Sequence, residues 1–277
     1  TMRLKIAILS LFILVYGQAI SQNVKILPDD PRIQKGSIAN GFTYYLIDND
    51  IRPGYADFYL VRKVGSIYED QGQYGFNTII ADMGVEGTRN FPNNTRLAYF
   101  DELGLDHSSD LQIVNGVENS LYKVTNIPVG ARESVVDSTL LILYNWAVSI
   151  NLDEEDVEVG KRFYVNTLYR DMAGDTLFND IIDGVGQYKA KDIRSFYYKW
   201  FSPDRMALVV VGDIDTNLFD TKIKSLFQAL PKFLETTEDR VVTFPGNEGP
   251  VVSVNRDPEG VGSRLCIHLT TPSLPAN

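Results

Sequence analysis

Thr78, Ala81 and Asp82 stand at positions i, i+3 and i+4 of a stretch that is predicted to be helical, so their side chains face the same way. Two ligands one turn apart on a helix, with a base beside them, can hold a catalytic zinc ion. Catalytic zinc takes three protein ligands and a water molecule, and a neighbouring base accepts a proton from that water. Asp82 is a single carboxylate, threonine is a poor zinc ligand, and alanine cannot act as a base. These three residues therefore share one side of a helix, but their types do not supply the chemistry of a catalytic zinc site.

The helix that carries these residues is predicted to end at Gly84 and to lead into a turn at residues 86–87. Its other side is apolar, with Ile79, Ile80 and Met83 at positions that would pack inward. We therefore expect this apolar side to hold the helix against a core.

The stretch 75–88 resembles the zinc-binding helix of the insulinase/pitrilysin metallopeptidases, a family that includes the mitochondrial processing peptidases. The family pattern is Gly-Leu-x-His-x-x-Glu-His-Met, then a small residue, an aromatic residue and Asn-Gly-Thr, and it is the inverted form of the zincin motif. In this resemblance Thr78 and Asp82 replace the two zinc-ligating histidines, and Ala81 replaces the general base. The residues that keep the frame of the motif are Gly75, Phe76, Met83, Gly87 and Thr88.

The resemblance places a third zinc ligand, a Glu that ends a Glu-Arg-x-x-x-x-x-Glu pattern, on a long helix predicted at 153–170. That position is Thr167, and no carboxylate occurs from residue 159 to residue 170. We therefore expect that Thr78, Asp82 and Thr167 bind no metal and that this chain has no cofactor. The resemblance implies zinc in active relatives only.

A strand predicted at 110–115, next to another at 119–124, resembles the family strand whose edge receives the substrate backbone. An edge strand can pair with an extended peptide because backbone groups carry that interaction. The candidate peptide-binding residues are Asp110, Leu111, Gln112 and Ile113. The sequence is equally consistent with an ordinary paired strand that has no role in binding.

Local patterns predict strands and helices along residues 35–230, the part of the chain that the resemblance covers well. Asn40-Gly41 is a strong signal for a hairpin turn between two strand-like runs. The other predicted elements are strands at 55–64 and 207–215 and helices at 95–103, 131–149, 153–170, 190–200 and 218–230. The resemblance implies an α+β fold: an insulinase-family peptidase-like domain with a mostly antiparallel sheet covered by helices, followed by the start of a second similar domain.

Residues 1–21 are predicted to be a secretory signal, with Thr1 interpreted as an addition ahead of Met2. A basic start and an apolar run precede small residues that suit cleavage after Ser21. The apolar run is too short for a comfortable membrane span. We therefore expect an exported protein of the periplasm or cell envelope of a Gram-negative bacterium, with no stable membrane span after cleavage.

The remaining chain divides into four predicted parts. They are an N-terminal arm at 22–34, an insulinase-like N-terminal domain at 35–232, a linker at 233–249, and the beginning of a truncated second domain at 250–277.

The net charge and the counts of cysteine and histidine exclude some kinds of binding partner and site. The formal net charge of −10 argues against binding to a phosphate backbone, which relies on Lys and Arg, so no nucleic-acid partner is expected. Cys266 is the only cysteine, which excludes an internal disulfide. The two histidines, His107 and His268, are interpreted as packed or surface residues rather than metal ligands.

These observations predict a catalytically inactive homologue of zinc metallopeptidases, a pseudo-peptidase that binds a peptide or a partner protein. A related, active peptidase subunit is one such partner. A first alternative is the N-terminal fragment of an active zinc-dependent endopeptidase whose metal site lies outside this fragment. A second alternative is a scaffold subunit of an envelope complex.

Overall fold

The computed structural model of the chain describes residues 30–86, 95–148, 150, 152–172, 176–232 and 239–240. The predicted signal at 1–21 and the predicted second domain at 250–277 lie outside the described residues, as does most of the predicted linker at 233–249. Cys266 and His268 lie outside them as well.

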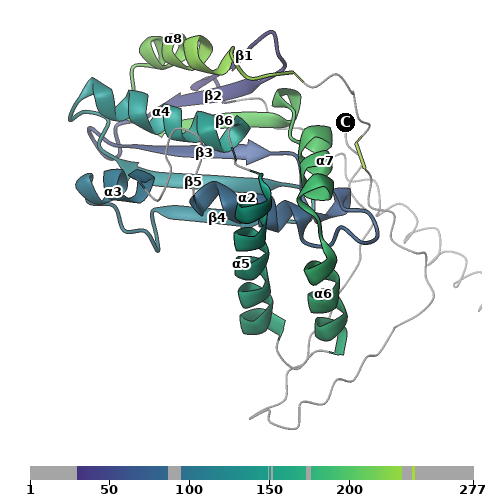
Figure 1. Cartoon of the computed structure of the whole chain (residues 1–277). Helices are drawn as coiled ribbons and strands as arrows, with labels where there is room; N and C mark the ends of the chain where they lie inside the picture. The colour runs from purple at the N-terminus through teal and green to yellow at the C-terminus, as the bar shows by residue number, and fades with distance from the viewer. Residues whose placement is uncertain are drawn as a thin grey trace, which may run out of the picture. The chain divides into compact units, whose positions relative to one another are not determined.

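A six-stranded sheet forms the centre of the described part of the chain, with its strands in the order β1-β2-β6-β3-β5-β4 (Figure 1). The strands are β1 (Ile33–Ser37), β2 (Thr43–Asp48), β3 (Ala56–Arg62), β4 (Leu111–Asn115), β5 (Ser120–Ile127) and β6 (Met206–Gly212). Neighbouring strands are antiparallel, except that β2 and β6 are parallel. The prediction of a mostly antiparallel sheet is therefore confirmed.

The first two strands form the predicted hairpin. Gly41 lies in its turn with a φ of +95°, a conformation that glycine adopts without steric cost. The first strand begins at Ile33, inside the region predicted as an arm at 22–34, because Ile33 pairs with Ile47 on β2.

The described helices are α2 (Phe76–Glu86), α3 (Thr95–Glu102), α4 (Glu133–Val148), α5 (Glu154–Met172), α6 (Thr176–Gln187), α7 (Ala190–Trp200) and α8 (Thr216–Phe227). Each of them is expected from the sequence pattern except α6. Gly184 and Gly186 give α6 a poor intrinsic helix propensity, but Lys161 of α5 donates to the carbonyl of Gly186 at its end. None of these described helices combines the length and the apolarity that crossing a membrane requires.

The end of α2 corrects the sequence prediction, because the helix continues through Gly84 to Glu86. The carbonyl of Gly84 accepts hydrogen bonds from Arg96 Nη1 at 2.7 Å and from Trp146 Nε1 at 2.8 Å. The carbonyl of Gly84 thus links α2 to α3 and α4, and Gly84 does not terminate the helix.

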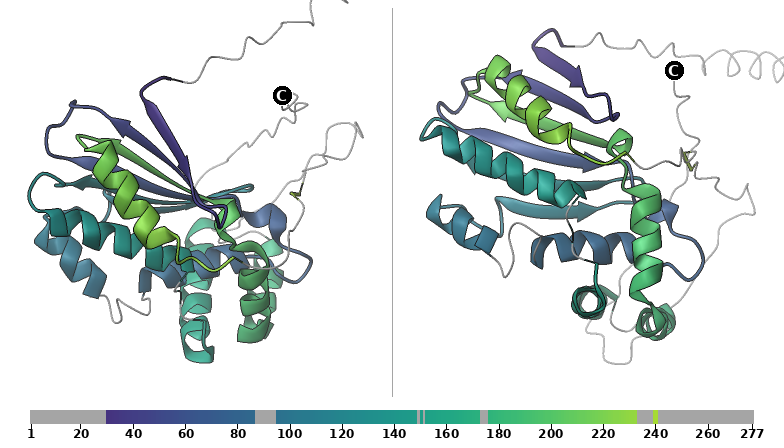
Figure 2. Two further views of the ribbon diagram at one scale, coloured as in Figure 1. Left: turned by 90° about the horizontal axis from the view of Figure 1, so that it is seen from above. Right: turned by 45° about the horizontal axis from the view of Figure 1, so that its top comes forward.

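The helices cover one side of the sheet, as two further views show (Figure 2). Strand residues alternate accordingly: in β3, for example, Phe58 and Leu60 are fully buried, whereas Tyr59 and Val61 on the opposite side are half-buried. The predicted inward side of α2 is confirmed, since Ile79, Ile80 and Met83 have at most 3% of their surface exposed. The hydrophobic core therefore lies between the sheet and the helix layer.

Two glycines let α5 pack closely against α2. A Cβ atom on Gly160 would lie 2.6 Å from Met83 Cγ, and one on Gly75 would lie 2.2 Å from the ring of Tyr164. Gly75 also has a φ of +87° directly before α2. The spacing between these two helices consequently depends on residues that carry no side chain.

We predict that Gly75→Ala lowers the free energy of unfolding by about 2–4 kcal/mol, because positive φ and steric overlap with Tyr164 both penalise the new methyl group. Gly72→Ala is the matched control: Gly72 has a φ of +85°, but nothing lies within 4 Å of the place that its new methyl group would take, so a loss of about 1–2 kcal/mol is expected. Urea denaturation measures both. Equal losses in the two variants would contradict the packing argument.

Candidate functional site

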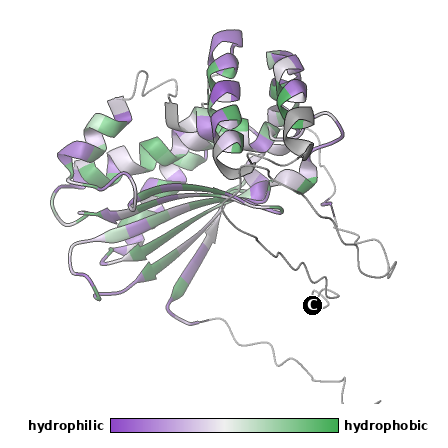
Figure 3. Ribbon diagram, turned by 90° about the horizontal axis from the view of Figure 1, so that it is seen from below, coloured by the Kyte–Doolittle hydropathy of each residue, from purple (hydrophilic) through white to green (hydrophobic). Residues whose placement is uncertain are grey.

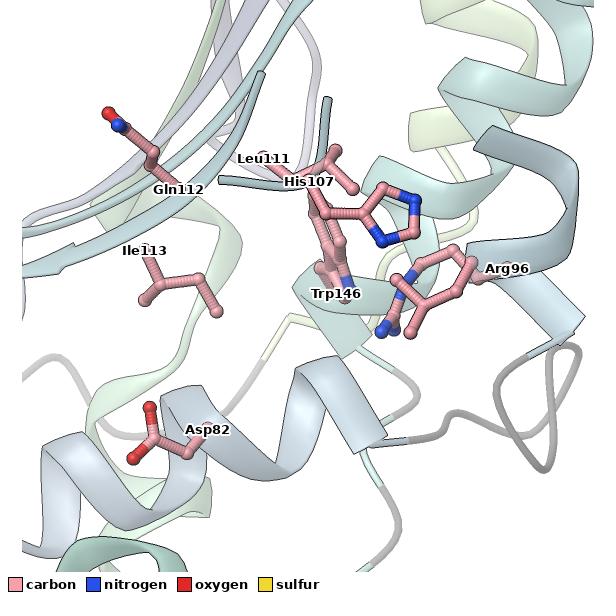
Figure 4. Close-up of a pocket in the computed structure, with 8 residues that line it drawn as sticks. Asp82, Arg96, His107, Leu111, Gln112, Ile113 and Trp146 are labelled. Carbon is pink, nitrogen blue, oxygen red and sulfur yellow. The ribbon is translucent and has the colours of Figure 1, made fainter. Parts of the chain in front are cut away.

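A cavity of about 300 Å³ opens between α2, the edge strand β4 and the helices α3 and α4 (Figure 4). Asp82 faces it from α2, and Leu111 and Ile113 face it from β4. The remaining lining residues are Arg96, Leu97, His107, Gln112 and Trp146. The cavity thus brings together a predicted site residue and the predicted peptide-binding strand.

The predicted site residues of α2 have different surroundings. Thr78 and Asp82, one turn apart, are half-buried. Ala81 has no exposed surface, and its carbonyl accepts a hydrogen bond from the Tyr122 hydroxyl at 3.3 Å. Burial raises the pKa of Tyr122, although Arg62 beside it acts in the opposite direction, so this hydroxyl is a neutral donor beneath α2.

Thr167 is half-buried on α5. Gly160 of α5 lies against Met83 and Ile79 of α2, and Thr167 lies about 10 Å beyond Gly160 along the helix axis. The convergence of Thr167 with Thr78 and Asp82 therefore stays a prediction.

The donor set does not fit catalytic zinc. Thr78 and Thr167 carry neutral hydroxyls, and Asp82 is one carboxylate, whereas such zinc sites use three imidazole, thiolate or carboxylate ligands. In the part of the chain that the structure describes, no three His, Cys, Asp or Glu side chains are grouped so that they could hold a metal ion. We derive no hydrolytic step from these residues.

The carboxylate of Asp110 is directed into the protein. This side chain is 7% exposed and accepts hydrogen bonds from Thr125 Oγ1 at 3.2 Å and from the backbone N–H of Asp106 at 3.0 Å. Of the four candidate peptide-binding residues, Asp110 thus anchors the start of β4, while the following three line the cavity.

The pairing of β4 with β5 determines which backbone N–H and C=O groups point to the free edge of β4. Asp110 and Gly116 bond to the neighbouring strand, through Thr125 N to Asp110 O and Gly116 N to Asn119 O. Because bonded and non-bonded pairs alternate in an antiparallel ladder, the N–H and C=O groups of Leu111, Ile113 and Asn115 point away from β5. An extended chain laid along this edge would meet those three residues.

The other end of α2 rests on the half-buried carboxyl group of Glu69. Glu69 accepts hydrogen bonds from the backbone N–H groups of Gly75 at 2.9 Å and Asn77 at 2.8 Å. Burial raises the pKa of Glu69 to about 7, and these two hydrogen bonds oppose that rise. Burial and the nearby Glu69 also raise the pKa values of Tyr164 and Tyr188 to about 12.

Comparison with known proteins agrees with this architecture. A family model described as the peptidase M16 inactive domain matches residues 188–276. The probable zinc protease PqqL of Haemophilus influenzae is 26% identical over 257 residues, which cover 84% of this chain and 27% of that protein.

Two solved structures share the fold. The periplasmic protease PqqL from Escherichia coli superposes with a TM-score of 0.68 and 21% identity, over 78% of this chain and 26% of that one. Pitrilysin superposes with a TM-score of 0.60 and 13% identity, over 81% of this chain and 26% of that one.

The chain is thus similar in sequence to probable zinc proteases and in fold to insulinase/pitrilysin peptidases. It spans about a quarter of the length of each of these relatives. The predicted insulinase-type α+β fold is therefore confirmed.

Sequence reasoning overlooked residues that this insulinase-type domain places around the cavity. Arg96 is 2% exposed, although an arginine in a short helix gives no local sign of burial. His107, interpreted as an ordinary packed or surface residue, lines the cavity with its Nε2 atom 3.0 Å from Asp101 Oδ1. Trp146 of α4 also lines the cavity, and no sequence signal marked that position.

We predict that stability falls between pH 4.5 and pH 7 because of Glu69. Its pKa is higher in the folded chain, so the folded state binds the proton more tightly, and this stabilisation is complete below pH 4.5 and lost as the pH rises through 7. The change is about 2–3 kcal/mol. Urea denaturation across this range should show it in the wild type and not in Glu69→Gln.

Asp70→Asn is the matched control, because Asp70 is a neighbouring carboxylate that is largely exposed and paired with Arg240 at 2.8 Å. It should keep the decline with pH. A Glu69→Gln variant with the same decline as the wild type would show that another group is responsible.

Proposed function

We propose that this chain binds an extended polypeptide along the edge of β4 and does not hydrolyse it. The observation that carries the proposal is the cavity beside that edge, in which Leu111, Ile113 and Asp82 meet. A strand added to β4 would bond to the backbone of the edge, and every second side chain would face the cavity. Such binding would depend little on sequence at most positions of the polypeptide.

The residue types on α2 support binding without cleavage. Peptide hydrolysis at a zinc site needs a metal that activates water and a base that accepts its proton. Thr78, Ala81 and Asp82 supply neither a zinc-binding set nor a base at the positions where the family has them. The helix that positions these residues is nevertheless kept, which suits a role in holding a chain.

We further propose export to the periplasm or cell envelope. The predicted signal at 1–21 supports this, as does the relative from Escherichia coli, which is described as a periplasmic protease. A peptide, a client protein or an active peptidase subunit would be the partner.

A second candidate function follows from the small share of its relatives' length that this chain spans. Because the chain spans 27% of a relative named as a probable zinc protease, it can be part of a longer active peptidase whose metal site lies elsewhere. A His-x-x-Glu-His motif in the remaining sequence would favour this candidate, and its absence would favour the first.

We predict that the purified wild-type chain contains no stoichiometric zinc, whereas Thr78→His/Asp82→His/Thr167→Glu contains about one zinc ion per chain. The reason is that three ligands of the proper type would then be available. Elemental analysis after dialysis measures the metal. In the matched control, Tyr169→Glu replaces Thr167→Glu and moves the carboxylate to a residue that is 53% exposed.

Stoichiometric zinc in the wild type, with cleavage of a mixed decapeptide library that a chelator stops, would overturn the proposed function. A triple variant with native circular dichroism but no zinc would show that Thr167 is in the wrong register.

We predict that Ile113→Pro weakens binding of fluorescein-labelled mixed decapeptides about tenfold or more, because proline removes an N–H group that points to the free edge. The β5 ladder should survive, since this N–H does not bond to β5. Ile113→Val keeps the N–H group and most of the side chain, and it should bind nearly as the wild type does. Fluorescence anisotropy measures both, and equal affinities would contradict pairing at this edge.

A further inference from the structure

A buried cation borders the cavity beside β4. Arg96, the second residue of α3, is 2% exposed and lines this cavity together with His107 and Trp146. Its Nη1 atom donates to the carbonyl of Gly84 at 2.7 Å, and its guanidinium carbon lies 5.5 Å from the ring centre of Trp146. These contacts hold the guanidinium group at the wall of the cavity, where α2, α3 and α4 meet.

The charge of this guanidinium group determines which ligand groups suit the adjoining part of the cavity. An arginine side chain does not lose its proton in proteins, and its charge acts more strongly in a buried place than in water. Carboxylates match the planar array of its N–H groups and form strong, charge-assisted hydrogen bonds with it. The part of the cavity beside Arg96 therefore favours a carboxylate over a neutral group of the same size.

His107 lines the same part of the cavity. In Figure 4 Arg96 and His107 enter the cavity on one side, and Asp82 enters it on another. The Nε2 atom of His107 lies 3.0 Å from Oδ1 of Asp101, whose side chain is 68% exposed, so that water and salt screen the charge of Asp101. A carboxylate that binds at Arg96 would thus have an imidazole as its second neighbour.

The α2 side of the cavity has the opposite charge. Asp82 is half-buried there, and in Figure 4 Ile113 lies nearer to Asp82, whereas Leu111 lies nearer to His107. A carboxylate beside Asp82 would be repelled by it. The charges therefore divide the cavity into a side that favours a negative group, at Arg96, and a side that disfavours one, at Asp82.

The rest of the lining is apolar. Much of the sheet is coloured as hydrophobic in Figure 3, and the edge strand β4 contributes Leu111 and Ile113 to the cavity. The helices contribute Leu97 and Trp146. A glutamate side chain in the cavity would place its methylene groups against this apolar surface, where their burial is favourable, and its carboxylate at Arg96.

We propose that the cavity beside β4 selects polypeptides by a carboxylate, which binds at Arg96 and His107. The inference rests on the proposed function, because pairing with β4 is what brings a polypeptide to the cavity. It goes beyond that function in naming the chemical class that the cavity recognises. An acidic side chain that faces the cavity and the C-terminal carboxylate of a chain that ends there share this chemistry.

Titration calorimetry with the wild-type chain and unlabelled nonapeptides of Ser, Thr and Val tests this selection. One peptide has glutamate at its centre and one has glutamine, and both are acetylated and amidated. A third has the central glutamine and a free C-terminal carboxylate. We expect at least one of the two carboxylate peptides to bind about tenfold more tightly than the neutral peptide. The glutamate peptide reports binding of a side chain, and the third peptide reports binding of a chain end.

Variants of the protein locate the groups that are responsible. Arg96→Met removes the charge and should abolish the preference for a carboxylate, while the neutral peptide still binds. Lys123→Met is the matched control, because Lys123 is a cation of the neighbouring strand β5 that does not line the cavity, and it should keep the preference. Asp82→Asn removes the repelling charge and should tighten binding of the glutamate peptide by about threefold.

Equal affinities of the wild type for all three peptides would overturn this inference, and the effect of Ile113→Pro would then decide separately whether the proposed function stands. Binding of no peptide would overturn both. A preference that Arg96→Met and Lys123→Met reduce alike would show a general attraction of anions and would also overturn the inference. Because Arg96 also bonds to α2, Arg96→Met is compared only if its circular dichroism is native, and the comparison of the three peptides on the wild type does not depend on that variant.

Discussion

The carboxyl ends of α2 and α4 are held by two buried guanidinium groups, and the geometry of the cavity depends on them. Arg62 is fully buried and donates to the Trp146 carbonyl in the last turn of α4 and to the Tyr122 hydroxyl. Arg96 donates to the carbonyl of Gly84 in α2. Burying a charge is costly, but the negative ends of helix dipoles and the rings of Tyr122 and Phe201 offset that cost.

Contacts at both ends and along one side hold α2 in place. The position of α2 is set by Glu69 at one end, by Arg96 at the other, and by Gly160 of α5 along its side. None of these residues would ligate a metal in the family arrangement. The contacts that hold α2 beside β4 therefore do not involve Thr78 and Asp82, the positions at which the resemblance places zinc ligands.

Much of the fold was predictable because its signals are local. Alternating apolar residues predicted β3, a continuous apolar run predicted β6 as a buried strand, and the Asn-Gly turn predicted the first hairpin. One error arose because intrinsic propensity alone decided the role of a glycine. Gly84 was predicted to end a helix, yet the helix continues to Glu86 and the carbonyl of Gly84 accepts a hydrogen bond from Arg96. No element was predicted at α6, whose glycines have a poor helix propensity.

The sequence by itself determined the residue types at positions 78, 81 and 82, and hence that no histidine or glutamate stands at this family motif. It also determined their helical spacing, because a period of 3.6 residues depends on neighbouring residues only. The tertiary structure alone decided that Arg96 and His107 border the same cavity as Asp82, and that Ala81 is fully buried. Burial and convergence arise from contacts between residues far apart in the chain, and no local pattern encodes those contacts.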